Sequence, residues 1–448
     1  MYKMNILFCR VLGFILLIMT GSANAVLNIE ITQGVEGALP VSIVPFGWEV
    51  PPQNPQMPIS LAPPKVAPID VAAIVRADLA RTGRFDPLPP KDMLAKPQVD
   101  STINFDNWRI FQSENLVVGT LQYVGANRYK IRFRLFDVFK GKQLEGFSLA
   151  ASGDDLRRAA HQVSDIIYEK LTGERGAFTT SVAYVTAAGQ RNARRYSLWI
   201  ADADGDGAQS MMRSREPILS PSWSPDGTRI AYASLEDNGH QVVFVQDVAS
   251  GRRDKVSAHK GLNGAPAWSP DGKSLAMSLS KDGNNEIYVI DLSSKKLKRL
   301  TRHWAIDTEP TWMPDGKSII FTSDRGGRPQ LYQVPSKGGK AKRLTFEGQY
   351  NAKATVSRDG KMLAMVHRID GNYRVAVLDL ESGNLRVLTD GALDESPSFA
   401  PNGSMVIYAT SAGDRGILKA VSVDGGIHQR LTVPEGDVRE PAWSPFMQ

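Results

Sequence analysis

The sequence contains almost no cysteine. Its single cysteine, Cys9, lies within residues 1–25, where two basic residues, an apolar run (11–19) and an Ala-Asn-Ala end follow one another. This order is typical of a secretory signal peptide, with cleavage expected between Ala25 and Val26. The chain left after cleavage would hold no cysteine, which excludes a disulfide framework and thiol chemistry.

A long hydrophobic run is also lacking. The apolar run of the leader is shorter than the roughly 20 residues that cross a bilayer as a helix, and no later stretch is long and apolar enough. We therefore expect an exported, periplasmic protein that does not insert directly into a membrane.

The sequence has no strong excess of charge of one sign. The net charge is +6, and because the leader carries two positive and no negative charges it falls to +4 (6 − 2) on cleavage. This modest excess is spread along the chain, so no nucleic-acid partner is expected. No serine has glycine at both the −2 and +2 positions, and the six histidines share no metal-ligand spacing. These absences disfavour a serine hydrolase and a zinc site.

A repeated motif dominates the second half of the chain. It follows the pattern Pro-Ser-Trp-Ser-Pro-Asp-Gly, and its copies start 43 to 45 residues apart, at Pro221, Pro266, Pro310, Ala354, Pro397 and Pro441. A period of about 40–45 residues is typical of four-stranded propeller blades. The Pro-Asp-Gly segment favours a tight turn, and Asn402 replaces the Asp in one copy, which indicates a turn role for that position. The aromatic position predicts packing between blades.

Three segments of alternating β-branched and aromatic residues follow each copy, so each blade is predicted to have strands a (the motif), b, c and d. Strand-like segments 181–186 and 196–201 precede the first motif without a strand a, whereas the last motif, 441–445, has nothing after it. Joining these two remainders predicts an all-β, six-bladed propeller over residues 178–448, closed by pairing of the C-terminal strand with the first blade.

A small α/β domain is predicted before the propeller, over residues 41–175. Strands are expected at 41–46, 116–124, 129–139 and 142–150, and helices at 69–81 and 154–171.

Residues 26–40 form a separate N-terminal peptide. Leu27, Ile29 and Ile31 share one face of an extended strand, and Gly34 supplies a hinge. The peptide can therefore add to a sheet edge by main-chain pairing.

Two places could hold a cation. Residues 202–207 imitate the first half of a calcium-binding EF-hand loop, but Arg213 stands where the loop needs a glutamate, and the alternative is a solvated c–d turn. The d–a loops bring acidic residues to one mouth of the channel, namely Asp307, Glu309, Asp394, Glu395, Asp437 and Glu440. An acidic channel could bind Ca²⁺ weakly, as in a metal-dependent lactonase or hydrolase; the alternative is a solvated rim at a protein interface.

The ordered set of features resembles the TolB family of periplasmic propeller proteins of the Tol-Pal system. The leader, the alternating peptide, the small α/β domain and the six blades all contribute, together with Val44-Pro45-Phe46, Asn263-Gly264-Ala265-Pro266 and Leu393-Asp394-Glu395. The resemblance covers the chain after the leader and implies protein binding without catalysis or a resident cofactor.

The resemblance also implies two partner sites on a monomeric protein. A Pal-like peptidoglycan-associated lipoprotein would bind the channel mouth, and a TolA-like inner-membrane protein would bind the N-terminal peptide through Val26, Leu27, Ile29, Ile31 and Gly34. Such a protein would serve outer-membrane constriction during cell division and envelope integrity. The expected mouth residues are Leu262, Asn263, Asp307, Thr308, Glu309, Asn351, Lys353, Asp394, Glu395, Arg439 and Glu440.

Overall fold

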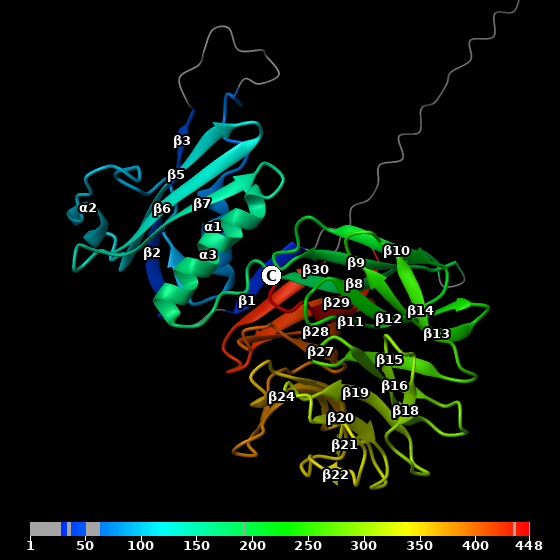
Figure 1. The fold of residues 1–448 in the computed structure, drawn as a ribbon. Coiled ribbons are helices and arrows are strands. Elements are labelled where there is room, and N and C mark those ends of the chain that lie inside the picture. Colours follow the sequence, from blue (N-terminus) through cyan, green and yellow to red (C-terminus); the bar gives the residue numbers. More distant parts are fainter. Residues whose placement is uncertain (1–27, 34–36, 51–62, 191–192, 433–435, 448) are drawn as a thin grey trace, which may run out of the picture.

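The computed structural model describes residues 28–33, 37–50, 63–190, 193–432 and 436–447. The expected signal peptide, its cleavage site, Val26, Leu27 and Gly34 lie outside these residues. Within them the chain forms a small α/β domain beside a propeller (Figure 1). No helix in the described part of the chain is long and apolar enough to cross a membrane.

The α/β domain is built on one mixed sheet. β2 pairs in parallel with β4 and β5, and β5, β6 and β7 continue as antiparallel neighbours. Helices α1 and α3 contribute to the larger core of this domain, and α2 contributes Trp108 to a second cluster. The elements are β2 (Leu39–Ile43), β3 (Gly47–Glu49), α1 (Val71–Arg81), β4 (Phe85–Pro87), α2 (Asp106–Arg109), β5 (Asn115–Gly125), β6 (Arg128–Asp137), β7 (Lys142–Ser152) and α3 (Leu156–Thr172).

Local chemistry sets the helix ends. Asp70 caps α1 because its carboxylate accepts a hydrogen bond from the Ala73 N–H at 2.8 Å, which places the helix start two residues after the expected Ile69. α3 ends at Gly173, whose φ of 76° is a left-handed conformation that glycine adopts without strain.

Six sheets form the propeller within the described residues, in agreement with the predicted six blades (Figure 1); five have four strands, and the sheet of blade 6 has five. From the channel outward, strands a to d are β31 (Asp437–Trp443), β8 (Ser181–Ala188), β9 (Arg195–Asp202) and β10 (Gln209–Ser214) in blade 1; β11 (Ile218–Trp223), β12 (Arg229–Asp237), β13 (His240–Asp247) and β14 (Arg253–Ser257) in blade 2; β15 (Asn263–Trp268), β16 (Ser274–Leu279), β17 (Glu286–Asp291) and β18 (Leu297–Arg299) in blade 3; β19 (Asp307–Trp312), β20 (Ser318–Ser323), β21 (Gln330–Pro335) and β22 (Lys342–Arg343) in blade 4; β23 (Asn351–Val356), β24 (Met362–Ile369), β25 (Asn372–Asp379) and β26 (Leu385–Val387) in blade 5; and β27 (Glu395–Phe399), β28 (Met405–Ala412), β29 (Arg415–Ser422) and β30 (His428–Thr432) in blade 6.

Strands from the two ends of the chain complete two of these sheets. β31 pairs with β8, so the last strand closes the first blade as predicted. β1 (Asn28–Gln33) pairs with β30 and adds a fifth strand to the outer edge of blade 6.

The repeated motif acts as its residue types predict. The Asp226 carboxylate accepts hydrogen bonds from the Thr228 N–H at 3.0 Å and from Ser224, and so holds a turn in which Gly227 has a φ of 71°. The indole N–H of Trp223 donates to the Ala442 carbonyl of the neighbouring blade at 3.0 Å. Trp268 and Trp312 repeat this contact between the next blades. The Asp therefore shapes the turn, and the Trp joins blades.

Candidate functional site

Four of the expected mouth residues are buried at the starts of inner strands. Asn263, Asp307, Asn351 and Asp394 have relative exposures of 0, 0, 0 and 1%. Each occupies the position three residues before a motif copy. A partner could contact these side chains only if their loops rearranged. In this structure they anchor the loops, and their role as direct contacts stays a prediction.

Their hydrogen bonds explain why buried polar groups are tolerated at these positions. The Asn263 amide accepts from the His259 N–H at 2.9 Å and donates to the His259 carbonyl at 2.6 Å. The Asn351 amide donates to the Glu347 carbonyl at 2.8 Å. Asp394 accepts from the Thr389 hydroxyl at 2.5 Å. Since a buried polar group is costly unless it is paired, these bonds hold the d–a loops in one shape.

Asp307 is anchored by charge. Its carboxylate forms an ion pair with Arg325 at 2.6 Å. Burial raises the pKa of Asp307 above its ordinary value, and the hydrogen bond and charge of Arg325 offset only part of that effect. Asp437 makes a similar pair with Arg194 at 2.7 Å. These two expected channel acids are thus already neutralised by arginines of the b–c loops.

A ring of strained residues lines the channel. One residue of each inner strand has a positive φ, between 49° and 55°, at the point where its pairing with strand b shifts register. This region is unfavourable for side chains other than glycine, and a fold keeps such strain only where the surroundings enforce it. These residues border a cavity of about 280 Å³, and they are Ser220, Ala265, Glu309, Lys353, Ser396 and Glu440.

Lys353 carries the positive charge of this ring. Its ammonium group lies 3.0 Å from Glu440 and 2.6 Å from the Ser396 hydroxyl, while its backbone N–H donates to Glu309 at 3.0 Å. Burial acts to lower the pKa of Lys353, but the charges of Glu440 and Glu309 outweigh it, so the pKa lies above its ordinary value. A lysine cation therefore already stands between the two channel glutamates.

The other expected mouth residues remain accessible in part. Leu262, Thr308 and Glu395 are half-buried, and Arg439 is exposed. In the described part of the chain, neither the channel nor its mouth holds three carboxylate or histidine groups close enough to share one metal ion.

Exposed apolar side chains on consecutive d–a loops escaped the sequence analysis. Trp304 and Phe346 have relative exposures of 78 and 73%, and Ile306 and Leu393 of 48% each. Arg343 lies over the Phe346 ring with its guanidinium carbon 5.3 Å from the ring centre. The sequence did carry a signal for this patch, because large apolar residues recur in loops that are usually solvated. Aromatic residues beside arginine are typical of the centres of protein interfaces.

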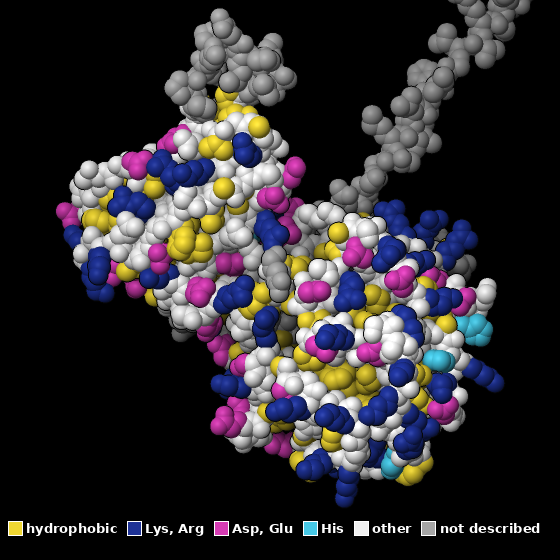
Figure 2. Space-filling view, viewed as in Figure 1, with side chains coloured by type: hydrophobic (Ala, Val, Ile, Leu, Met, Phe, Trp, Pro, Cys, Tyr) yellow, Lys and Arg dark blue, Asp and Glu magenta, His cyan; other side chains and the backbone are white. Residues whose placement is uncertain are grey.

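The face drawn in Figure 2 shows no concentration of charge of one sign. Lysine and arginine side chains are spread over the propeller there, with acidic side chains between them. This distribution differs from the single basic stripe of a nucleic-acid site.

The N-terminal strand forms the second candidate site. β1 lies antiparallel to β30 with Ile29 opposite Leu431 and Ile31 opposite Gln429. Ile29 packs against a propeller core cluster, whereas Ile31 is 36% exposed. The sheet-edge pairing predicted for this segment thus occurs within the chain itself, at the outer edge of blade 6.

Comparisons with known proteins agree with this architecture. Residues 168–447 match the model of the TolB β-propeller domain, and residues 27–144 match that of the TolB amino-terminal domain. The Tol-Pal system protein TolB of Thioalkalivibrio sulfidiphilus is 56% identical over 95% of both chains. That of Nitrosococcus oceani is 55% identical over 98% of this chain and 99% of its own.

A solved structure supports the same assignment. The crystal structure of TolB from Acinetobacter baumannii superposes with a TM-score of 0.83 at 42% identity, and the match covers 94% of this chain and all of that one. By sequence and by fold, the chain belongs to the TolB family of Tol-Pal system proteins.

Proposed function

We propose that this chain is a non-enzymatic, periplasmic linker protein that binds two partners of the Tol-Pal system. A Pal-like lipoprotein binds the mouth of the propeller channel, and a TolA-like inner-membrane protein binds residues 26–40. Linking the two would serve constriction of the outer membrane during division and the integrity of the envelope.

The observation that carries the lipoprotein site is the arc of exposed Trp304, Phe346 and Leu393 on consecutive d–a loops. Exposed aromatic groups on rigid loops lose little conformational freedom when a partner covers them. The buried anchors below, such as Asn351, keep those loops in shape. The α/β domain contacts the opposite turns of the propeller, as shown by the hydrogen bond from Asn402 to the Arg175 carbonyl at 3.0 Å. The mouth therefore remains open to a partner.

The main test is lipoprotein affinity after truncating one exposed aromatic group. Phe346→Ala should weaken binding by about 2 kcal/mol, which is about thirtyfold in Kd, while the melting temperature stays unchanged. The matched control is Phe139→Ala, because Phe139 is 57% exposed but belongs to the α/β domain. Equal losses for both variants, or none for either, would contradict the placement.

The proposal of an N-terminal partner site rests on the position of β1 at the outer edge of blade 6. An edge strand can leave its sheet and pair with another chain through the same main-chain groups. If lipoprotein binding favours the docked state of β1, each partner must weaken the binding of the other by the same factor. Titrating each partner in the presence of the other tests this, and independent, additive binding would end the coupling.

We infer that the channel works without a resident metal ion, because the Lys353 ammonium already neutralises the glutamates that would hold one. Calcium should therefore change neither the melting temperature nor lipoprotein affinity. A clear calcium-induced rise in melting temperature would favour the metal-dependent hydrolase instead.

A further inference from the structure

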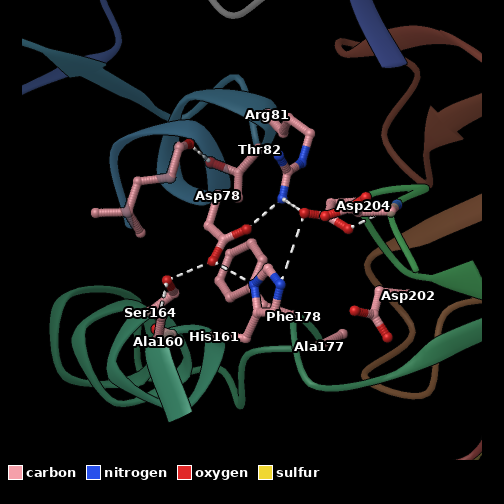
Figure 3. Close-up of polar contacts among 12 residues, drawn as sticks. Asp78, Arg81, Thr82, Ala160, His161, Ser164, Ala177, Phe178, Asp202 and Asp204 are labelled. Carbon is pink, nitrogen blue, oxygen red and sulfur yellow. Dashed lines mark hydrogen bonds and ion pairs between the residues drawn. The ribbon is translucent and has the colours of Figure 1, made fainter. Parts of the chain in front are cut away.

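The α/β domain and the propeller meet at a cluster of buried charges (Figure 3). Asp78 and Arg81 come from α1, His161 comes from α3, and Asp204 comes from the β9–β10 turn of blade 1. Asp78 and His161 are 0 and 2% exposed. The turn that carries Asp204 was expected to be solvated, but its carboxylate is only 6% exposed. The solvated-turn alternative therefore holds for Asp206, whose side chain is 51% exposed, but is wrong for Asp204.

His161 stands between two carboxylates that belong to different domains. Its Nδ1 lies 2.8 Å from Asp78, and its Nε2 lies 3.6 Å from Asp204 and has no hydrogen-bond partner. An ionised carboxylate only accepts hydrogen bonds, so Nδ1 must carry a proton to bond Asp78. Nε2 can then carry a proton only if the ring is the imidazolium cation. Neutral His161 instead turns a lone pair toward Asp204.

Charged groups from both domains surround the His161 ring. On α1, Arg81 pairs with Asp78 and also lies 3.8 Å from Asp204. On α3, Arg157 pairs with Asp204 and lies 3.0 Å from Asp206 and 3.7 Å from Asp202. Asp165 of α3 lies near Asp78 as well, and is held by the Phe178 N–H at 2.8 Å. The two arginines balance much of the acidic charge.

Burial lowers the pKa of His161, but the hydrogen bond to Asp78 and the charges of Asp78 and Asp204 outweigh it. The pKa therefore lies above its ordinary value of 6.5. Asp78 belongs to the same domain as His161, so only the part of the raised pKa that comes from Asp204 stabilises the docked state. That stabilisation is present at low pH and is lost as the pH rises through the pKa of the docked state.

The cluster is connected to the N-terminal strand through α1. The Arg81 carbonyl, at the end of α1, accepts a hydrogen bond from the Gln429 side chain at 2.5 Å. Gln429 belongs to β30 and lies opposite Ile31 of β1. A displacement of α1 from the propeller would thus remove a contact from the strand that holds β1.

We propose that protonation of His161 fastens the α/β domain to blade 1 and, through α1 and Gln429, holds β1 on blade 6. Deprotonation weakens the contact of His161 with Asp204, so β1 separates from β30 more readily and can pair with another chain. We call this pH-dependent contact of His161 with Asp204, and its effect on β1, the latch. The idea that the latch controls the N-terminal partner site rests on the proposed function, whereas the latch itself does not.

Hydrogen exchange of the β1 amides tests the latch without any partner. Protection, corrected for the intrinsic pH dependence of exchange, should fall several-fold in the wild-type protein between about pH 5.5 and about pH 8.5. In His161→Gln it should be constant over this range, because glutamine does not titrate. The matched control His240→Gln removes an exposed histidine of blade 2 and should keep the wild-type profile.

A second variant keeps the test decisive if His161→Gln is unstable. Asp204→Asn changes only the propeller side and leaves the His161–Asp78 pair in place, so it should flatten the pH profile while the α/β domain stays folded. A wild-type profile retained in both variants, or a flat profile in the wild type, would overturn the latch. If β1 protection follows pH but deletion of residues 26–32 leaves the inner-membrane partner's affinity unchanged, the latch stands and the N-terminal part of the proposed function fails.

Discussion

The strands at the two ends of the chain each complete a sheet, but at opposite edges. β31 is the inner strand of blade 1, where Asp437, Val438 and Ala442 are buried. β1 is the outer strand of blade 6, where Glu30 and Thr32 are exposed. An inner strand contacts its own sheet and both adjacent blades, whereas an outer strand contacts little beyond one partner strand. The fold therefore buries β31 between blades and leaves β1 at an outer sheet edge.

Specific contacts tie β31 to three blades. The backbone N–H of Trp443 donates to the Ser398 hydroxyl of blade 6 at 3.0 Å, and the Ala442 carbonyl accepts from the indole N–H of Trp223 in blade 2. Glu440 reaches Lys353 of blade 5 across the channel. For β1, the side-chain hydrogen bond found in the described residues joins Thr32 to the His428 carbonyl at 3.3 Å.

Removal of β31 should have the largest effect on stability. Ending the chain after Gly436 exposes the inner edge of β8 and the packing surfaces of blades 6 and 2, so we expect loss of cooperative folding of the propeller. We expect the loss to be comparable to the total stability of about 5–15 kcal/mol that is usual for a domain. Circular dichroism and a thermal melt measure it, and a variant that melts like the full chain would contradict the closure.

Trp443→Ala tests the same end with one side chain. The indole is half-buried and donates to the Thr180 hydroxyl at 2.8 Å. We expect a loss of about 2–3 kcal/mol in the free energy of unfolding, below the 3–5 kcal/mol typical of a fully buried Trp. Denaturant titration measures the change, and Trp304→Ala is the control, because Trp304 is 78% exposed and its loss should be nearly neutral.

Deleting residues 26–32 tests the other end. Because β1 covers only an outer edge, the free energy of unfolding should fall by about 1 kcal/mol or less, since few buried contacts are lost. Binding of the TolA-like partner should disappear, while lipoprotein binding persists. Calorimetry with each partner separates the two outcomes, and unchanged affinity for the inner-membrane partner would refute the peptide site.

The smallest expected difference lies within β1 itself. Ile29→Ser should weaken β1 docking by about 1 kcal/mol, because Ile29 packs against the propeller core. Ile31→Ser should change docking by less than about 0.5 kcal/mol, because its side chain is partly in water already. Hydrogen exchange of the β1 amides distinguishes the two variants. Equal effects of both substitutions would mean that strand pairing alone holds β1.

Local sequence patterns predicted much of this molecule. The motif period, the turn residues such as Gly227, and the strand a lacking from the first blade together led to six blades and their closure, because each depends on contacts near in sequence or repeated along it. The capacity of Ile29 and Ile31 to add to a sheet edge was visible for the same reason.

The candidate sites were predicted less well. Asn351 and Asp394 were recognised as residues of the mouth loops, but their burial depends on how each loop folds over its own strand. Asp204 looked like a solvated turn residue because Arg157 and His161 of α3, which cover it, lie more than forty residues away in the sequence. No local pattern could report that contact.

The repeat, the blade count and the strand order could be predicted from the sequence, since they follow from alternating apolar residues and turn chemistry. Which polar side chains face water and which anchor loops became clear only from the folded structure, as did the place of Lys353 in the channel and of His161 between Asp78 and Asp204. Burial and charge pairing arise between segments far apart in the chain, and their energies depend on distances that spacing along the sequence does not specify.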